Sequence, residues 1–535
     1  MRIIRRMWNT ESGLLVGLVA LPAAVAVLAY LFGRRSPRRF GQLGALTAAA
    51  GFLGSLALTV AVARGPAISA APAGLDLTVD RLAVVLLLLV FGVSAIVQAF
   101  AVRYLGGDRR APWFTGGAGL LTAASAGLMT ADTLIGLAVF WSLAGLALCL
   151  LLGMYWQLPS ARDGVRRTAI AFVIGDLALW TAVILATVTW GRIDLRALEP
   201  GQLSGGLLPV LAVLVVLAAL SRSAQIPFHR WLPATLTAPT PVSALLHAGV
   251  VNAGGILLIR LAPLATDDLA RVLTILAGAA TMAYGGAVML AKPDIKGALV
   301  NSTTAQMGFM ILTCGLGLWA AAVIHLVAHG FYKSTLFLSS GSAIASHRRH
   351  EALPALPQPN RAQRVVNLIA AVALPAIALA AALAVVPDGS GDQAAEHALL
   401  IFALVTGAAL TAGWLRRSPG LRGAALAAIF LVPAAIAYVA VITALSSFLT
   451  PALPDPGLPV VAVWAITVAA VIGLGVLAAA RWAPGAEAIR RVLYTQAINA
   501  GHIPAARQPT GPALPAPTQS DADQRTPAQL TGARL

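Results

Sequence analysis

Apolar stretches of about 20 residues recur from one end of the chain to the other, and this repetition constrains the fold more than any other feature. A helix of that length crosses the hydrocarbon core of a membrane, where all backbone groups must be paired within the protein. Hydrophobic residues make up 59% of the 535 positions and charged residues 11%, which excludes a soluble class. Fifteen candidate spans are centred near residues 23, 52, 91, 122, 144, 179, 214, 252, 280, 307, 330, 376, 406, 436 and 470. The sequence therefore predicts an all-α polytopic membrane protein with about 14–15 transmembrane helices.

The distribution of charge predicts how these spans are oriented. The formal net charge of +17 would indicate nucleic-acid binding in a soluble protein, but here the basic residues are spread among short connections. Connections after odd-numbered spans are basic, with Arg34, Arg35, Arg38, Arg39, Arg103, Arg109, Arg110, Arg162, Arg166, Arg167, Lys292, Lys296, Arg348, Arg349, Arg361, Arg364, Arg416, Arg417, Arg422, Arg481, Arg490 and Arg491. Connections after even-numbered spans are acidic, with Asp76, Asp80, Asp267, Asp268, Asp388, Asp392 and Asp455. Because basic loops stay in the cytoplasm, we predict a multi-pass protein of the bacterial inner membrane with its N-terminus outside and its C-terminus in the cytoplasm, although Arg2, Arg5 and Arg6 oppose this orientation.

Three protonatable residues, His325, His329 and Lys333, lie four positions apart in the apolar run from Trp319 to Leu338. At about 100° and 1.5 Å per residue, this spacing places them on one face of a helix, about 12 Å from first to last. Ionisable groups at membrane depth are energetically costly and mark functional sites. Histidine has an ordinary pKa of about 6.5, and a buried lysine can be shifted toward that range, so the row is suited to passing protons. The alternative is structural: the histidines hydrogen-bond across helices and Lys333 extends to the membrane interface.

A second signal is the segment SRSAQIPFHRWLPATLTAPTPVSALLHAGVVNAGGILLIRL, residues 221–261. Prolines interrupt it at Pro227, Pro233, Pro239 and Pro241. Irregular backbone is tolerated at membrane depth where it lines a cavity or is covered by protein, so we expect the span near 214 to break at Pro227 beside a transport site. The polar residues beside this break are Arg222, His229, Arg230 and, in the next span, His247. For His229 and Arg230 the alternative is a loop that contacts lipid headgroups, and for His247 it is a structural hydrogen bond.

Two further stretches, DIKGALVNSTTAQMGFM from Asp294 to Met310 and HLVAHGFYKSTLFLSSGS from His325 to Ser342, complete a pattern with residues 221–261. Together they resemble the antiporter-like membrane subunits of respiratory complex I and of Mrp antiporters. The resemblance implies two inverted five-helix repeats with discontinuous helices and a hydrated polar axis at mid-membrane. The phrases PFHRWL, APTPVSALLHAGVVNAGG, MGFMILTCGLG, AHGFYKSTLFLSSGS and LYTQAINAGH look more similar to one branch, the DabB subunits of DAB inorganic carbon accumulation systems.

The chain departs from the family pattern at several functional positions. Where the resemblance implies a glutamate in the fifth helix, the aligned stretch FWSLAGLALCLLLG has Ser142 after Trp141. The central lysine of the seventh helix aligns with Arg222, and an arginine does not give up its proton, so it acts as a fixed charge. Asp176 matches a family aspartate and is the expected partner of Arg222; the alternative for Asp176 is a helix-end cap in a structural ion pair. The span near 376 contains no lysine, so the exit-side charge of complex I homologues is absent.

The expected pathway residues are therefore His247, His325, His329, Lys333, Asp176 and Arg222, with Lys296 and His229 as secondary members. For Lys296, as for Lys292 and Asp294 beside it, the alternative is an ordinary basic cytoplasmic loop. Lysine is scarce, because the chain has only these two and Lys333. Cys149 and Cys314 lie in apolar spans without metal-ligand spacing, which favours a packing role.

The resemblance implies a membrane subunit that conducts H⁺ or Na⁺ to power a DabA-like, zinc-binding cytoplasmic partner that resembles β-carbonic anhydrases. We expect no metal, no cofactor and no enzyme activity in this chain, and no nucleic-acid partner, because it has no Cys/His zinc cluster and no nucleotide, flavin or iron–sulfur motif. The alternatives are a proton-translocating subunit of an NADH-quinone oxidoreductase, an Mrp-type cation/proton antiporter, and a structural assembly scaffold.

We expect four regions: N-terminal helices (1–110), an antiporter-like conducting core (111–415), C-terminal helices (416–491) and a largely disordered cytoplasmic tail (492–535).

Overall fold

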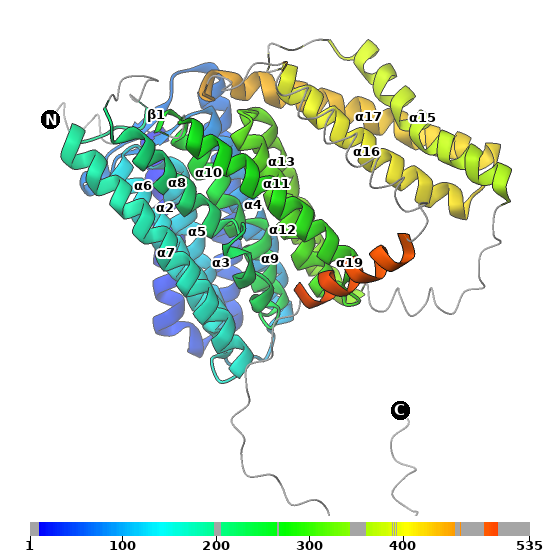
Figure 1. Cartoon of the computed structure of the whole chain (residues 1–535). Coiled ribbons are helices and arrows are strands. Elements are labelled where there is room, and N and C mark those ends of the chain that lie inside the picture. The colour runs from blue at the N-terminus through cyan, green and yellow to red at the C-terminus, as the bar shows by residue number, and fades with distance from the viewer. Residues whose placement is uncertain are drawn as a thin grey trace, which may run out of the picture.

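The computed structural model describes residues 10–196, 205–264, 267–342, 360–387, 393–454 and 486–500, together with 389, 391 and 461. Long helices dominate these residues (Figure 1). The helices are α2 Thr10–Phe32, α3 Pro37–Arg64, α4 Arg81–Tyr104, α5 Ala111–Thr130, α6 Leu134–Leu152, α7 Pro159–Trp190, α8 Leu208–Arg222, α9 Thr240–Ala248, α10 Ala253–Arg260, α11 Asp268–Ala291, α12 Ile295–Gly315, α13 Trp319–Leu338, α15 Arg361–Val385, α16 Gln393–Arg417, α17 Leu421–Leu449 and α19 Ala486–Ala500. The predicted all-α fold is confirmed.

Eleven helical segments among the described residues are long and apolar enough to cross a membrane. Fourteen of the fifteen predicted centres fall within these segments or within the further helices α5, α8 and α12. The fifteenth, near residue 470, lies outside the described residues. So do the predicted loop charges at 348, 349, 388, 392, 455 and 481, and the predicted tail beyond 500. Helix α19 crosses the expected boundary at 491 and is helical through Ala500.

Several helices begin where the sequence offers a side chain to cap them. Asp80, Thr133, Asp267 and Asp294 each accept a hydrogen bond from the backbone N–H in the first turn of α4, α6, α11 and α12. Asn360 forms a reciprocal capping box at the start of α15. These caps satisfy backbone donors that would otherwise lie unpaired near the membrane surface.

A small hairpin, which hydropathy does not predict, lies at one end of the bundle. Strands β1 Ile68–Ala70 and β2 Leu77–Val79 pair antiparallel, with Ser69 opposite Thr78. The hydroxyl of Thr78 donates to Asp132 at 2.8 Å, which attaches the hairpin to the loop before α6. Nearby, hydrogen bonds to Asp194 and Asp76 raise the pKa of the Arg192 guanidinium. Polar contacts of this kind belong to a surface loop layer and not to the membrane interior.

Two spans in the middle of the chain are interrupted. Helix α8 ends at Arg222, five residues before the predicted break at Pro227, because the chain already turns at Ala224, whose φ of 51° lies in the left-handed region. Two 3₁₀ turns, Phe228–Trp231 and Pro233–Thr235, follow. The next span is divided by a third turn, Val250–Asn252, into the short helices α9 and α10. The predicted irregular backbone is therefore present. It is buried at Ser223–Gln225 and Val250–Asn252, whereas Pro227 and Arg230 are exposed.

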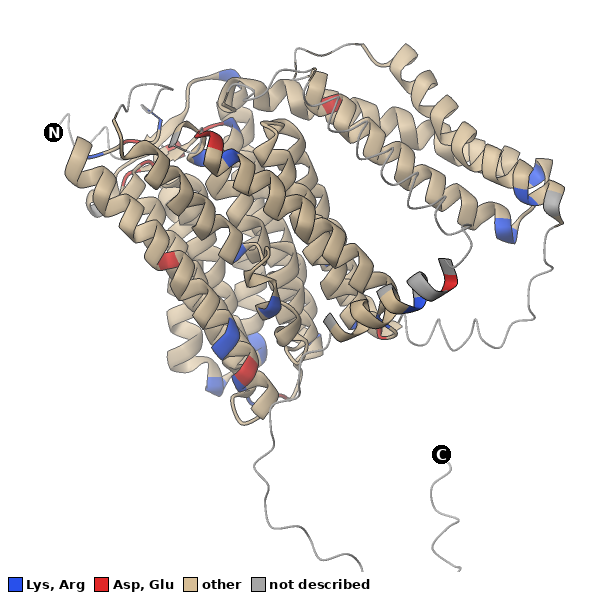
Figure 2. Cartoon of the chain, in the orientation of Figure 1, with Lys and Arg blue, Asp and Glu red and all other residues tan. Residues whose placement is uncertain are grey.

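The helices form two groups (Figure 1). Helices α2 to α13 make the larger bundle, and α15, α16 and α17 pack on one another and contact it through α13 and α4. Helix α19 lies against α11. Charged residues lie mainly at the two ends of the helices, with few in between (Figure 2). The few charges in between are therefore informative about function.

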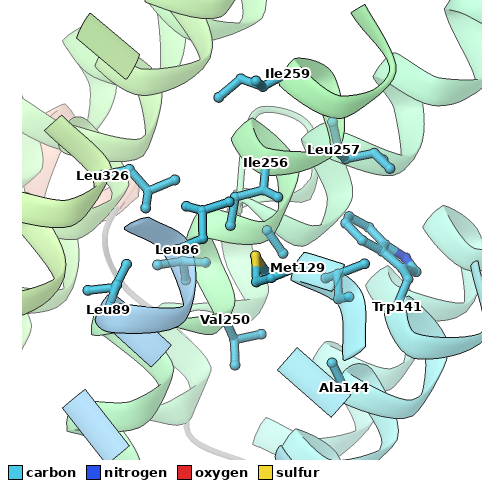
Figure 3. Packing of buried hydrophobic residues seen from close by; sticks show 14 of the residues in the cluster. Leu86, Leu89, Met129, Trp141, Ala144, Val250, Ile256, Leu257, Ile259 and Leu326 are labelled. Carbon is cyan, nitrogen blue, oxygen red and sulfur yellow. The ribbon is translucent and has the colours of Figure 1, made fainter. Parts of the chain in front are cut away.

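The core of the larger bundle is an apolar layer where α4, α5, α6, α10 and α13 meet. Figure 3 shows Leu86 and Leu89 of α4 near Leu326 of α13, with Met129 between them and Trp141. Glycines allow the closest helix contacts, since a Cβ on Gly278 or Gly308 would lie within 3 Å of backbone on the facing helix, α12 or α11. This packing fixes the helices that carry the polar residues described next.

Candidate functional site

The three residues of the predicted row lie on one buried face of α13. His325, His329 and Lys333 are 7%, 4% and 2% exposed. The rings of His325 and His329 stack with centroids 5.9 Å apart and planes at 25°. The four-residue spacing therefore produces the expected alignment, and Lys333 does not extend to an interface.

Lys333 is held by helix α12. Its Nζ donates to the carbonyl of Leu299 at 3.3 Å and to the hydroxyl of Ser302, which itself donates to the same carbonyl at 3.1 Å. In the part of the chain that the structure describes, no carboxylate forms an ion pair with this ammonium group. A buried lysine with only neutral partners is poorly compensated when charged, so its proton is well placed for transfer.

His247 joins the row from a second helix. It is in the last turn of α9, just before the division of that span, and its ring stacks on Phe337 of α13 at 4.4 Å and 11°. The two helices approach closely because Gly330 faces the carbonyl of Ala248; a Cβ there would lie 2.9 Å from that oxygen. The structure thus brings His247 to the face of α13 that carries His329 and Lys333, and these residues are near enough to interact electrostatically.

Several nitrogens of this row have no hydrogen-bond partner although they are buried. They are Nδ1 of His247, Nε2 of His325 and both ring nitrogens of His329. Buried polar groups are usually paired, and each exception needs an explanation. Imidazole nitrogens that are not occupied by structural hydrogen bonds remain free to accept and donate protons. This observation favours the relay over the structural alternative for the histidines.

A second polar group surrounds Arg222. Its Nη2 donates to Asp176 at 2.7 Å, and its Nη1 donates to the carbonyl of Trp141 at 3.2 Å. The guanidinium lies over the rings of Trp141 and Phe172, 4.4 and 4.1 Å from their centroids. A Cβ on Gly145 would lie 2.7 Å from Nη1, so glycine makes room for the guanidinium. The predicted Arg222–Asp176 pair is therefore formed, and Asp176 does not act as a helix-end cap, because it lies within α7.

Ser142, which stands where the resemblance implies a glutamate, is a neutral residue with a hydrogen-bond partner. Ser142 accepts a hydrogen bond from the indole Nε1 of Trp180 at 3.1 Å. The indole of Trp141 donates to the same oxygen of Asp176 that Arg222 uses, at 2.8 Å. Among the described residues, Asp176 is thus the carboxylate that bonds to this group, and it is paired with the fixed charge of Arg222.

A cavity of about 50 Å³ lies beside Arg222. Residues of α4, α5, α6 and the division between α9 and α10 line it, and its polar lining residues are Ser94, Thr122, Ser125, Arg222 and Asn252. The lining is mostly apolar, but a volume of this size has room for a few water molecules beside these polar groups. Some of the apolar residues labelled in Figure 3, among them Leu86, Leu89 and Ile256, also form part of the wall.

The two secondary residues differ in position. Lys296 lies in the first turn of α12, after the capping residue Asp294, and its charge acts on His247. His229 lies in the turn after α8 and packs edge-on against Tyr284 at 4.6 Å, on a different neighbour from the α13 row. Lys296 therefore lies on the helix that holds Lys333, whereas His229 contacts Tyr284 of α11.

Sequence reasoning missed a set of buried amides and one acid. Each has a side-chain oxygen without a partner: Gln98, Gln225, Asn252, Asn301 and Glu396. Isolated amides in apolar spans were the available signal, as in AIVQAF for Gln98 and AGVVNAGG for Asn252. Among the described residues no group of three His, Cys, Asp or Glu side chains could hold a metal ion. Cys149 and Cys314 are free thiols within helices.

Comparison with known families places these groups in a common framework. A model described as "NADH:quinone oxidoreductase/Mrp antiporter, TM" matches residues 131–386, and one described as "NADH-Ubiquinone oxidoreductase (complex I), chain 5 N-terminus" matches residues 68–115. The chain belongs to this antiporter-like family of membrane subunits. The first matched range contains the α13 row, His247 and the Arg222–Asp176 pair, so the predicted family is confirmed.

Individual relatives are membrane-complex subunits by their names. The chain is 37% identical over 357 residues to "Probable inorganic carbon transporter subunit DabB1" of Halothiobacillus neapolitanus, covering 63% of each protein. It is 35% identical over 354 residues to "NADH-quinone oxidoreductase subunit L" of Mycobacterium tuberculosis, covering 62% of this chain and 56% of that protein. The matches thus span less than two thirds of these relatives' length.

Among solved structures, the chain is similar to the "Structure of Mrp complex from Dietzia sp. DQ12-45-1b", with a TM-score of 0.57 and 25% identity. The match covers 95% of this chain and 64% of that one. Together with the eleven apolar helical segments, these relatives identify a multi-pass antiporter-like membrane protein.

Proposed function

We propose that this chain is the membrane subunit of an energy-coupled inorganic carbon pump in the bacterial inner membrane. It passes H⁺ or Na⁺ down its gradient and thereby powers a DabA-like, zinc-binding cytoplasmic partner that converts CO₂ to bicarbonate. The chemistry of hydration belongs to that partner, and the conducting residues belong to this chain. In this proposal the N-terminus is outside and the C-terminus is cytoplasmic.

The observation that carries the proposal is the asymmetry between the two polar groups. The α13 row has unpaired nitrogens and a lysine with neutral partners, whereas the Arg222 group has a permanent charge paired with Asp176. The α13 row can exchange protons, whereas the Arg222 group holds a fixed ion pair. This combination is poorly suited to a complete proton channel of the complex I type. It is well suited to a subunit that delivers ions to a partner.

The energy available is adequate for this task. Each elementary charge that crosses 100 mV supplies about 2.3 kcal/mol. One charge can therefore change the ratio of bicarbonate to CO₂ by about fiftyfold, since 1.4 kcal/mol corresponds to a factor of about ten. Coupling to one ion is enough to bias a near-equilibrium hydration in one direction.

The runner-up function is ion translocation in an NADH-quinone oxidoreductase or an Mrp-type antiporter. The identity of 35% to a subunit L and the structural likeness to an Mrp complex favour it. Against it stand Ser142 in place of an acid and Arg222 in place of a lysine that could exchange its proton. An independent antiporter needs carboxylates that alternate, and Asp176 is already bound to Arg222.

The test is growth of a host that lacks carbonic anhydrase. Co-expression of the chain with a candidate zinc partner should restore growth in ordinary air, and His325→Ala, Lys333→Ala or an uncoupler should abolish the rescue. Lys292→Ala, at the cytoplasmic end of α11, is the matched control and should retain it. Copurification with NADH oxidoreductase subunits, without the zinc partner, would overturn the carbon proposal in favour of the runner-up.

A further inference from the structure

Two cavities lie along α4, one turn of helix apart. The first is the central cavity beside Arg222, which Ser94 and Thr122 line. The second, about 360 Å³, lies where the α2–α3 and α4–α5 connections meet, with Arg38, Gln98 and Thr115 in its wall. Both connections follow odd-numbered spans, so the second cavity is at the predicted cytoplasmic end.

A short polar chain joins the two cavities. Gln98 donates from Nε2 to the hydroxyl of Ser94 at 2.9 Å, and Ser94 lies 2.7 Å from the hydroxyl of Thr122. All three side chains are buried, with exposures of 4%, 2% and 3%. Gln98 lines the second cavity, at the cytoplasmic end, and the two hydroxyls line the central cavity. The bonded groups therefore extend from one cavity to the other without interruption.

A role in helix packing explains only part of this arrangement. Thr122 also donates to the carbonyl of Ala118 within its own helix, which is an ordinary structural bond. The Oε1 of Gln98, however, is buried without a partner, and burying an unpaired carbonyl is unfavourable. Gly44 faces this oxygen, and a Cβ there would lie 2.3 Å from it. Glycine leaves the space around the unpaired oxygen free.

We propose that Gln98, Ser94 and Thr122 form a hydrated inlet, open to the cytoplasmic-end cavity, through which protons pass between that cavity and the central cavity at Arg222 and Asp176, separate from the α13 row. The inlet rests on the proposed function, in that the chain conducts ions. Ser94 exchanges a proton with water in the cytoplasmic-end cavity, Thr122 exchanges one with water in the central cavity, and one proton passes between the two hydroxyls, so no net charge remains on either. Gln98 orients water and does not itself exchange protons. The direct 2.7 Å contact between Ser94 and Thr122 leaves no room for Na⁺ between them, so this route carries protons only.

Accessibility is tested first, because it does not depend on activity. In inverted membrane vesicles that contain the full chain, Gln98→Cys should react with a charged methanethiosulfonate reagent at least about tenfold faster than Ser55→Cys. Ser55 is equally buried, bonds to the carbonyl of Gly51 in its own helix and lines neither cavity. The parental chain supplies the background from Cys149 and Cys314. Equal rates at the two positions would overturn the inlet.

Conduction is tested second, in proteoliposomes with a proton gradient. Ser94→Ala combined with Thr122→Val should reduce proton flux by about tenfold, because the hydroxyl relay is lost. Gly44→Leu should reduce it by filling the space at Gln98, whereas Ser55→Ala and Gly286→Ala, where a Cβ meets nothing within 4 Å, should not. Unchanged flux in the double variant, with Gln98→Cys still reactive, would overturn the role in conduction. If the unaltered chain shows no flux while Gln98→Cys reacts, the proposed function fails and the hydrated inlet stands.

Discussion

At the scale of single residues, the protein separates an exchangeable charge from a permanent one. Lys333 is bonded to a carbonyl and a hydroxyl, so neither its charged nor its neutral form is strongly fixed. Arg222 is bonded to a carboxylate and placed over two aromatic rings, so its charge is permanent. The two residues lie in neighbouring parts of one bundle, and their different partners give them different chemistry.

Lys333→Met should abolish ion flux while leaving the protein folded. Methionine has a similar length and shape but no proton to give, and the carbonyl of Leu299 remains bonded to Ser302. Flux in proteoliposomes and the unfolding temperature in lipid nanodiscs are the two measurements. Lys292→Met, on a lysine at the end of α11, is the control and should conduct normally. Normal conduction by Lys333→Met would remove the α13 row from the pathway.

Arg222→Met should destabilise the protein, because it leaves the Asp176 carboxylate without its cation. The loss should lie at the lower end of the ~3–5 kcal/mol known for broken buried pairs, since Asp176 keeps 24% exposure. Adding Asp176→Asn should recover part of that loss. A double-mutant cycle from denaturation in nanodiscs measures the coupling. Additive losses would show that the pair contributes no stability.

At the scale of elements, short or divided helices position the site. Helix α9 has nine residues and ends at the turn after His247, so the imidazole lies beside α13. The approach of the two helices depends on Gly330, whose missing side chain admits the carbonyl of Ala248 and a methyl group of Leu89. The alignment of the row with His247 is thus a property of helix packing.

Gly330→Ala should separate α13 from α9 and reduce ion flux more than it reduces stability. Overpacking of this kind typically destabilises by about 1–3 kcal/mol. Flux in proteoliposomes and thermal unfolding of the same preparation give the two effects. Gly286→Ala on α11 is the matched helical control, because its new methyl group meets nothing within 4 Å. An equal change in both variants would mean that the spacing between α9 and α13 does not matter.

The sequence predicts most of the helices and the alignment of the α13 row, but not the exact break after α8 or the role of Gln98. Periodicity alone placed His325, His329 and Lys333 on one face, because helix geometry is local. The break was placed at Pro227, but the chain turns earlier, at Ala224, whose backbone conformation depends on tertiary packing. Gln98 and the cavities it joins were missed because an isolated amide in an apolar span carries no periodic signal. Contacts with the neighbouring helices, such as Gly44 of α3 against Gln98 and Thr122 of α5 against Ser94, decide its role.

At the scale of the whole molecule, the α15–α17 group closes one side of the row. Phe402 of α16 packs 5.4 Å from Phe309 and 5.9 Å from His325, measured between ring centroids. Glu396, earlier on the same helix, has a buried oxygen without a partner. The first residue of the row, His325, therefore lies at the boundary between the two helix groups.

Phe402→Ala should open this boundary and raise passive proton leak. The loss of stability should stay below the ~3–5 kcal/mol of a fully buried phenylalanine, because Phe402 is only half-buried. Leak is measured as the decay of an imposed proton gradient in proteoliposomes. Phe430→Ala on α17, which is 67% exposed, is the control. An unchanged decay rate would show that the aromatic contact does not seal the row.

The burial of Lys333 has a practical consequence for chemistry on the intact protein. Because the chain has lysine at only three positions, the number of acyl groups that an amine-directed reagent adds shows how many of these lysines are accessible. In the folded chain the reagent reaches Lys292 and Lys296, which are partly exposed, and the modification of Lys333 requires water to enter the bundle. The mass of a single additional acyl group would thus record how often the interior becomes wet during turnover.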